Sequence, residues 1–248
     1  MMQETRDRLC RYADKYETRD FINGDPSWFM HQVTGAENQE AMAFIASTLS
    51  YGSRKQFMPK IDYILQQSRG EVDDWVRERR YEPLFRADDT RSFYRLYSYQ
   101  QYAHFLDVYS GMMSEYGSLG EYVRSRATTG YEAVEAICSL FSERGVSVIV
   151  PKDTASACKR VCMFLRWMVR DNSDVDLGLW EFIDKRTLIM PLDTHVMQQS
   201  AALGLISAKS ASMRTAIQLT DALCTVFPED PLKGDFALFG YGVTHAHP

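Results

Sequence analysis

The hydrophobic side chains of this chain recur at the spacing of an α-helix along nearly its whole length. In the segment 39–50, QEAMAFIASTLS, the apolar residues fall on one helical face, and Asn38 is placed to cap the helix. Similar patterns run over 56–68, 99–117, 130–145 and 151–174. No segment alternates convincingly as a half-buried strand does, and the lone β-like run GVSVIVP at 145–151 predicts an extended connector. The sequence therefore predicts an all-α fold.

Charge and cysteine content narrow the possible classes of protein. The 248 residues carry a net charge of −5, so any contact with nucleic acid must depend on a local basic patch. The five cysteines are scattered without a CxxC pair, which argues against a disulfide framework or a four-cysteine iron–sulfur cluster and favours the reducing cytoplasm. The charged N-terminal segment predicts no signal peptide, and no apolar run is long enough to span a membrane.

One window of this acidic chain, residues 151–170, is strongly basic. Asp153 or Thr154 is placed to cap a helix there. Against the single acid of the window stand Lys152, Lys159, Arg160, Arg166 and Arg170. Two interpretations of these cations are open: they form the solvated face of an amphipathic helix, or they contact phosphates.

The segment PLDTHV, residues 191–196, contains an acid at a predicted helix entrance. Asp193 can cap the helix, and Gly204 can end it. The same carboxylate can also point a second oxygen into a cleft. A pure cap and a catalytic acid are therefore both open interpretations of Asp193.

Three segments, taken in order, resemble the helix-hairpin-helix DNA glycosylases, the base-excision repair superfamily that includes endonuclease III and the 8-oxoguanine glycosylases. The segment EAMAFIASTLSYGSRKQFMPKIDYIL is similar to the helix–loop–helix whose polar loop reaches into DNA. In SACKRVCMFLRWMV, Lys159 stands at the position of the nucleophilic lysine of bifunctional members. PLDTHV is similar to the VDTHV motif of the superfamily, which makes Asp193 the match of the catalytic aspartate.

The chain also resembles, more closely, a bacterial family catalogued only as a domain of unknown function, through SACKRVCMFLRWMVRD, PLDTHV and EDPLKGDFALFGYG. It departs from the glycosylases in two places. The predicted hairpin VPKDTASACKR contains no glycine, and there is no C-terminal cysteine cluster. The spacing of 34 residues from Lys159 to Asp193 is closer to that of the archaeal 8-oxoguanine branch.

The resemblance implies a DNA N-glycosylase, with β-lyase activity, that acts on double-stranded DNA with a flipped damaged base, an oxidised purine by the archaeal comparison. Lys159 would form a Schiff base, and Asp193 would stabilise the positive charge that develops on the sugar. The positive end of the helix dipole, with Lys159 near the second turn, would disfavour the lysine cation. The implied DNA-binding residues are Ser50, Tyr51, Gly52, Ser53, Arg54, Arg160, Arg166, Arg170, Thr194 and His195.

Phe236 and Phe239 have two open interpretations, a base-stacking wall or an ordinary core pair at helical spacing. No cofactor and no metal is expected, because no second ligand accompanies His195 at helical spacing.

The implied fold is two-lobed, with a divergent helix-hairpin-helix and a cleft between the lobes that would hold Lys159 and Asp193. One lobe is expected over 37–170 and the other over 1–36 plus 171–248. The expected location is the cytoplasm, on the bacterial nucleoid if the protein binds DNA. The alternative function is a catalytically silent helical module that binds nucleic acid or protein, which the glycine-free hairpin and the negative net charge favour.

Overall fold

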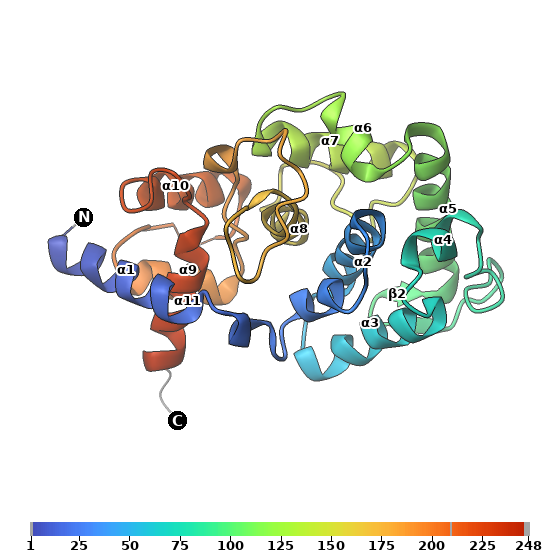
Figure 1. Ribbon diagram of the computed structural model, residues 1–248, viewed down its shortest axis with the longest axis horizontal. Helices are drawn as coiled ribbons and strands as arrows, with labels where there is room; N and C mark the ends of the chain where they lie inside the picture. The colour runs from blue at the N-terminus through green and yellow to red at the C-terminus, as the bar shows by residue number, and fades with distance from the viewer. Residues whose placement is uncertain (1, 209, 246–248) are drawn as a thin grey trace. The chain divides into compact units, whose positions relative to one another are not determined.

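The computed structural model describes residues 2–208 and 210–245, and over these residues the chain is all-α, as predicted (Figure 1). The α-helices are α1 (Gln3–Tyr16), α2 (Ala36–Leu49), α3 (Arg54–Ser68), α4 (Val72–Arg77), α5 (Tyr99–Tyr116), α6 (Leu119–Arg124), α7 (Gly130–Glu143), α8 (Lys159–Val169), α9 (Thr194–Ala202), α10 (Met213–Cys224) and α11 (Lys233–His245). Short 3-10 helices are η1 (Arg19–Ile22), η2 (Pro26–His31) and η3 (Lys185–Thr187).

A small antiparallel hairpin was not predicted from the sequence. Strands β1 (Ser92–Tyr94) and β2 (Tyr97–Ser98) pair Ser92 with Ser98 and Tyr94 with Tyr97. Arg95, at the turn between them, has a left-handed backbone with φ of 51°. Strands of three and two residues are too short to display a period-2 pattern, so the sequence gives no strand signal here.

Two local predictions about helix ends and connectors were wrong. Gly35, with φ of 90°, occupies the N-cap of α2, whereas Asn38 donates its side-chain amide to the Thr34 carbonyl at 3.0 Å. The connector at 145–151 is a turn rather than an extended segment, because the backbone amides of Ile149 and Val150 both donate to the Val146 carbonyl. In both places a local hydrogen bond, made by the Asn38 side chain in the first and by the backbone in the second, replaces the predicted conformation.

The chain divides into two compact units that differ in outline from the predicted lobes. Unit 1 comprises residues 1–23, 128–134 and 154–248, and unit 2 comprises 24–127 and 135–153. The helix that begins at Lys159 therefore belongs with the C-terminal segments rather than with the central helices.

In unit 1 the two ends of the described chain lie side by side, as α1 and α11 (Figure 1). Aromatic rings of the two helices pack edge to face, with centroids 5.7 Å apart for Tyr16 and Phe239 and 6.1 Å apart for Tyr12 and Tyr241. Gly240 allows this approach, since a Cβ atom there would lie 2.2 Å from the Tyr16 ring. This pairing places the first turn of α11, which carries Asp235, at a defined position in unit 1.

Unit 2 is built around α2, whose residues 40–49 are all buried. A helix that is buried on every side must be surrounded by other elements, and α3, α4 and η2 all pack against α2. Phe44 lies within 5.8 Å of the ring centroids of Phe105, Tyr109 and Phe141. This aromatic cluster is the core that supports the loop after α2.

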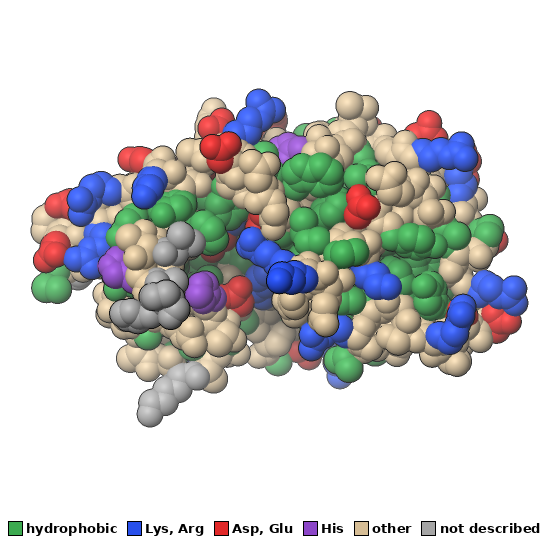
Figure 2. Space-filling view, turned by 90° about the horizontal axis from the view of Figure 1, so that it is seen from below, with side chains coloured by type: hydrophobic (Ala, Val, Ile, Leu, Met, Phe, Trp, Pro, Cys, Tyr) green, Lys and Arg blue, Asp and Glu red, His purple; other side chains and the backbone are tan. Residues whose placement is uncertain are grey.

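The surface charge is mixed. On the face in Figure 2, lysine and arginine side chains occur in small groups among acidic and uncharged ones, without a continuous basic area. Within the described residues, no helix combines the length and apolar composition needed to cross a membrane.

Candidate functional site

Asp193 caps α9, as its position in the sequence predicted. Its Oδ1 accepts a hydrogen bond from the Val196 amide at 2.9 Å, which leaves Oδ2 outside the capping bond. At the other end, Gly204 is left-handed with φ of 69°, and the Leu205 amide donates to the Ser200 carbonyl at 2.8 Å. This is the Schellman arrangement that the glycine predicted. The half-buried Asp193 is therefore rigidly held at a helix entrance.

Lys159 is the first residue of α8, not a residue of its second turn. The predicted cap at Asp153 or Thr154 is wrong, because Cys158 is the N-cap and its left-handed backbone, with φ of 46°, interrupts any helix from further upstream. The half-buried Lys159 therefore lies in the first turn, where unpaired amides and the dipole disfavour a cation most strongly. Its Nζ donates to the Met163 sulfur at 3.4 Å.

Asp235, in the first turn of α11, brings Lys159 and Asp193 into one site. Its Oδ2 accepts a hydrogen bond from the Arg166 guanidinium. Burial raises the pKa of Asp235, the positive charges of Arg166 and Lys159 oppose that rise, and the negative charge of Asp193 adds to it. All three neighbours must lie within electrostatic range for these effects to act. Helices α8, α9 and α11 of unit 1 thus gather a lysine and two carboxylates.

The sequence prediction missed Asp235. In the segment GDFALFG the two phenylalanines were predicted as candidates, although an acid in the first turn of a helix, such as Asp235, is itself a signal. What the sequence lacked was any indication that this turn packs beside α8 and α9.

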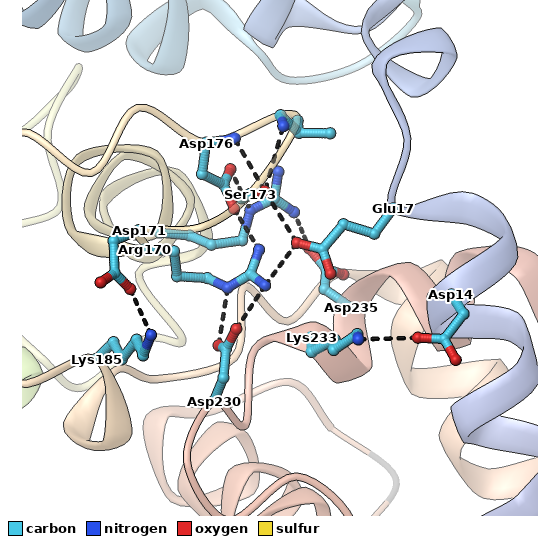
Figure 3. A network of polar contacts seen from close by, with 12 residues as sticks. Asp14, Glu17, Arg170, Asp171, Ser173, Asp176, Lys185, Asp230, Lys233 and Asp235 are labelled. Atoms are coloured by element: carbon cyan, nitrogen blue, oxygen red, sulfur yellow. Dashed lines mark hydrogen bonds and ion pairs between the residues drawn. The ribbon is translucent and has the colours of Figure 1, made fainter.

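Arg166 and Arg170 do not form a DNA-binding face, so that prediction was wrong for both. Their side chains are only 5% and 1% exposed. Arg166 pairs with Asp176 and Asp235, and Arg170 pairs with the partners shown in Figure 3, namely Glu17, Asp176 and Asp230. Burial acts to lower the pKa of Arg170, but these carboxylates outweigh it and raise the pKa. Neither of the two sequence interpretations, solvated or phosphate-facing, fits these residues.

The other predicted DNA contacts of unit 1 are accessible. Arg160 is half-buried in the first turn of α8, and Thr194 and His195 are exposed in the first turn of α9. A Cβ atom at Gly242 would lie 3.2 Å from His195 Nε2, so α11 passes close beneath this histidine. Arg160 thus follows Lys159 directly in the sequence, and Thr194 and His195 follow Asp193.

The two phenylalanines of α11 are packing residues of unit 1. Phe236 is fully buried, and its ring lies 4.8 Å from the Arg166 guanidinium and 5.3 Å from that of Arg170. The base-pocket prediction for Phe236 is therefore wrong, because its side chain is fully buried and offers no accessible surface to a base. Phe239 is half-buried, with its ring 5.0 Å from that of Phe21.

The predicted DNA loop after α2 is partly accessible. Ser50 is an exception, since it is 4% exposed and donates its hydroxyl to the Ala46 carbonyl at 2.7 Å, so the prediction for Ser50 was wrong. Tyr51 is half-buried, whereas Gly52, Ser53 and Arg54 are exposed. Ser53 is the N-cap of α3, and Arg54 pairs with Asp25 at 3.3 Å.

The unpredicted hairpin is attached to this loop. Tyr51 donates its hydroxyl to the Tyr94 carbonyl at 3.4 Å, and the Tyr94 hydroxyl donates back to the Tyr51 carbonyl. The Arg95 guanidinium lies 5.5 Å from the Tyr51 ring centre, and Leu96 at the tip is 78% exposed. We call residues 51–54 and 94–96 the loop–hairpin surface.

Among the residues that the structure describes, no group of three or more His, Cys, Asp and Glu side chains is arranged to hold a metal ion. The candidate site consists of ionisable side chains, namely the amine of Lys159 and the carboxylates of Asp193 and Asp235.

These features define an all-α protein in which Asp235 lies within electrostatic range of one amine, Lys159, and a second carboxylate, Asp193, near the N-terminal ends of three helices. Residues 25–244 match the family described as "Protein of unknown function (DUF2400)", and the chain belongs to that family. The resemblance to a family of unknown function is thus confirmed, while the glycosylase resemblance stays a prediction. No curated protein and no solved structure matches the chain.

Proposed function

We propose that this protein is a DNA N-glycosylase with β-lyase activity that removes a damaged base, with oxidised purines as the first substrates to test. The observation that carries the proposal is that Lys159, the first residue of α8, and Asp193, the N-cap of α9, both lie within electrostatic range of Asp235. The motif resemblance assigns the same two residues to nucleophile and carboxylate, so sequence and geometry support the same pair.

In the proposed reaction the neutral amine of Lys159 donates its lone pair to C1′ of the sugar. The C1′–N bond to the base breaks, and its electrons leave with the base, which takes up a proton. Positive charge develops on the sugar in this step, and the Asp193 carboxylate stabilises that charge. Loss of a proton from nitrogen and opening of the sugar ring then give the Schiff base, from which β-elimination cleaves the strand.

Recognition of DNA is proposed to use accessible groups only. In unit 1 these are Arg160, Thr194 and His195, and in unit 2 they are Arg54 and its neighbours on the loop–hairpin surface. The phosphate contacts would make affinity depend steeply on salt, and the target nucleotide would have to leave the base stack.

A second candidate function is a catalytically silent module that binds nucleic acid. The loop–hairpin surface favours it, because Arg54, Arg95 and the exposed Leu96 are accessible without any involvement of Lys159. The two candidates differ in a single respect, whether a bound duplex is chemically altered.

A panel of duplexes with defined oxidised, deaminated and abasic sites separates the candidates. Under single turnover, base release from the oxidised and deaminated duplexes is read as alkali-sensitive strand cleavage, and lyase action on the abasic duplexes is read as cleavage without alkali. Binding is measured on the same duplexes. The proposed enzyme cleaves at least one duplex in the panel, and cleavage is lost in the Lys159→Gln variant. Binding without cleavage across the panel supports the silent module, and neither binding nor cleavage refutes both.

A further inference from the structure

Asp235 faces the stripe of α8 that carries the proposed nucleophile. Lys159, Met163 and Arg166 follow one another at i, i+4 and i+7, which places them on the same side of the helix. Met163 receives a hydrogen bond from Lys159 Nζ, and Arg166 donates to the Asp235 carboxylate. The carboxylate is therefore tied to the stripe by one cation and lies within electrostatic range of the other.

The remaining charges around α11 are compensated elsewhere. From α1, Glu17 pairs with Arg170, and Asp14 pairs with Lys233 at 2.9 Å. In the same network, shown in Figure 3, Asp230 pairs with Arg170, and Asp176 pairs with both Arg170 and Arg166. The charges that act on Asp235 itself are those of Arg166, Asp193 and Lys159. Asp235 is thus the carboxylate that connects the buried arginine network to the proposed site.

We propose that Asp235 is a positioning residue, whose clamped carboxylate holds the Lys159 ammonium in place and sets the pH at which its amine becomes nucleophilic. A negative charge near an ammonium group favours the charged form, so Asp235 opposes the helix terminus, which favours the neutral amine. Arg166 keeps the carboxylate from moving toward the lysine. The role in catalysis rests on the proposed function, whereas the electrostatic effect on Lys159 does not.

The test measures the reactivity of Lys159 in the full chain without DNA. Competitive acetylation with acetic anhydride over a pH series, read by mass spectrometry, gives the midpoint at which the amine becomes reactive, with the exposed Lys55 as an internal reference. Asp235→Asn is expected to lower the Lys159 midpoint by about one pH unit, because one nearby negative charge is removed. Asp235→Glu keeps the charge and is expected to restore the wild-type midpoint.

Asp230→Asn is the matched control, since it removes a carboxylate from the same network at Arg170 and is expected to leave the midpoint unchanged. If Asp235→Asn folds poorly by circular dichroism, Asp235→Ser supplies the same loss of charge with a smaller side chain. An unchanged midpoint in the uncharged variant, or an equal shift in Asp230→Asn, overturns the proposal. A shifted midpoint in a protein that cleaves no damaged duplex would reject the glycosylase function alone.

Discussion

Arg166 and Arg170, near the C-terminal end of α8, have the same chemistry as the arginines of the loop–hairpin surface and opposite surroundings. Arg170 is 1% exposed and is held by three carboxylates, whereas the Arg54 side chain is 55% exposed beside a single aspartate. A buried guanidinium needs several acceptors to offset its lost hydration, and an exposed one does not. Basic residues of this chain therefore fall into two kinds: Arg166 and Arg170 are buried partners of carboxylates, whereas Arg54 is exposed to solvent.

The largest effect is expected from breaking the buried network. Arg170→Ala leaves Asp230 and Asp176 without their shared cation, and should lower the free energy of unfolding by about 3–5 kcal/mol. Chemical denaturation measures this loss. Arg186→Ala, at an exposed pair with Asp184, is the control and should change the free energy of unfolding by less than about 1 kcal/mol. Equal effects in the two variants would contradict the distinction between buried and exposed arginines.

The next effect separates capping from catalysis at Asp193. Asparagine caps a helix about as well as aspartate, so Asp193→Asn should change stability by only a few tenths of a kcal/mol. It removes the charge that the developing sugar cation needs, which should slow base release by about 10²-fold or more. Asp193→Ala should also lower stability, by about 1 kcal/mol, because the bond to the Val196 amide is lost. Full activity in Asp193→Asn would reduce this residue to a cap.

A structural feature could be predicted from the sequence when the residues that form it are close together along the chain. The all-α fold, the Asp193 cap and the Gly204 stop depend on neighbouring residues, and all three predictions were confirmed. The burial of Arg170 depends on Glu17, 153 positions away, and no local pattern reveals that pairing.

The start of α8 shows a different limit. A left-handed Cys158 is an uncommon conformation for a residue with a side chain, and the capping residues further upstream are good ones by composition. The start of α8 therefore depends on packing, which overrides the preference of the upstream residues Asp153 and Thr154 for the N-cap position.

A smaller effect is expected at Gly52 on the loop–hairpin surface. Gly52→Ala forces a side chain onto a residue with φ of 82°, and its Cβ would lie 2.7 Å from an Arg95 guanidinium nitrogen. Stability should fall by about 1–2 kcal/mol, and Arg95 should move off the Tyr51 ring. Gly70→Ala is the matched control, because its φ is 81° and no atom lies within 4 Å of its Cβ position. If only Gly52→Ala weakens DNA binding, the loss is due to the displaced Arg95. If both variants bind DNA equally well, Arg95 does not contact DNA.

The smallest effect is expected at Arg54. Arg54→Ala should leave stability within about 0.5 kcal/mol of wild type, since the side chain is exposed. If Arg54 contacts a phosphate, the slope of log affinity against log salt should flatten by about 0.9. Titration of a fluorescent duplex at several salt concentrations measures the slope. Arg86→Ala, at another exposed arginine that pairs with an aspartate, Asp88, should keep the wild-type slope. Identical slopes in all three proteins would exclude Arg54 from the DNA contact.

In the proposed reaction Lys159 forms a covalent Schiff base with the sugar of a damaged nucleotide. Borohydride reduction of the protein with duplexes containing oxidised purines or abasic sites traps such a Schiff base as a stable amine. We expect a trapped adduct in which peptide mapping finds the sugar on Lys159. We expect no such adduct in the Lys159→Gln variant, although that variant still binds the duplex. An adduct on another lysine would contradict this proposal. So would the absence of any adduct in a protein that releases damaged bases or that only binds the duplexes.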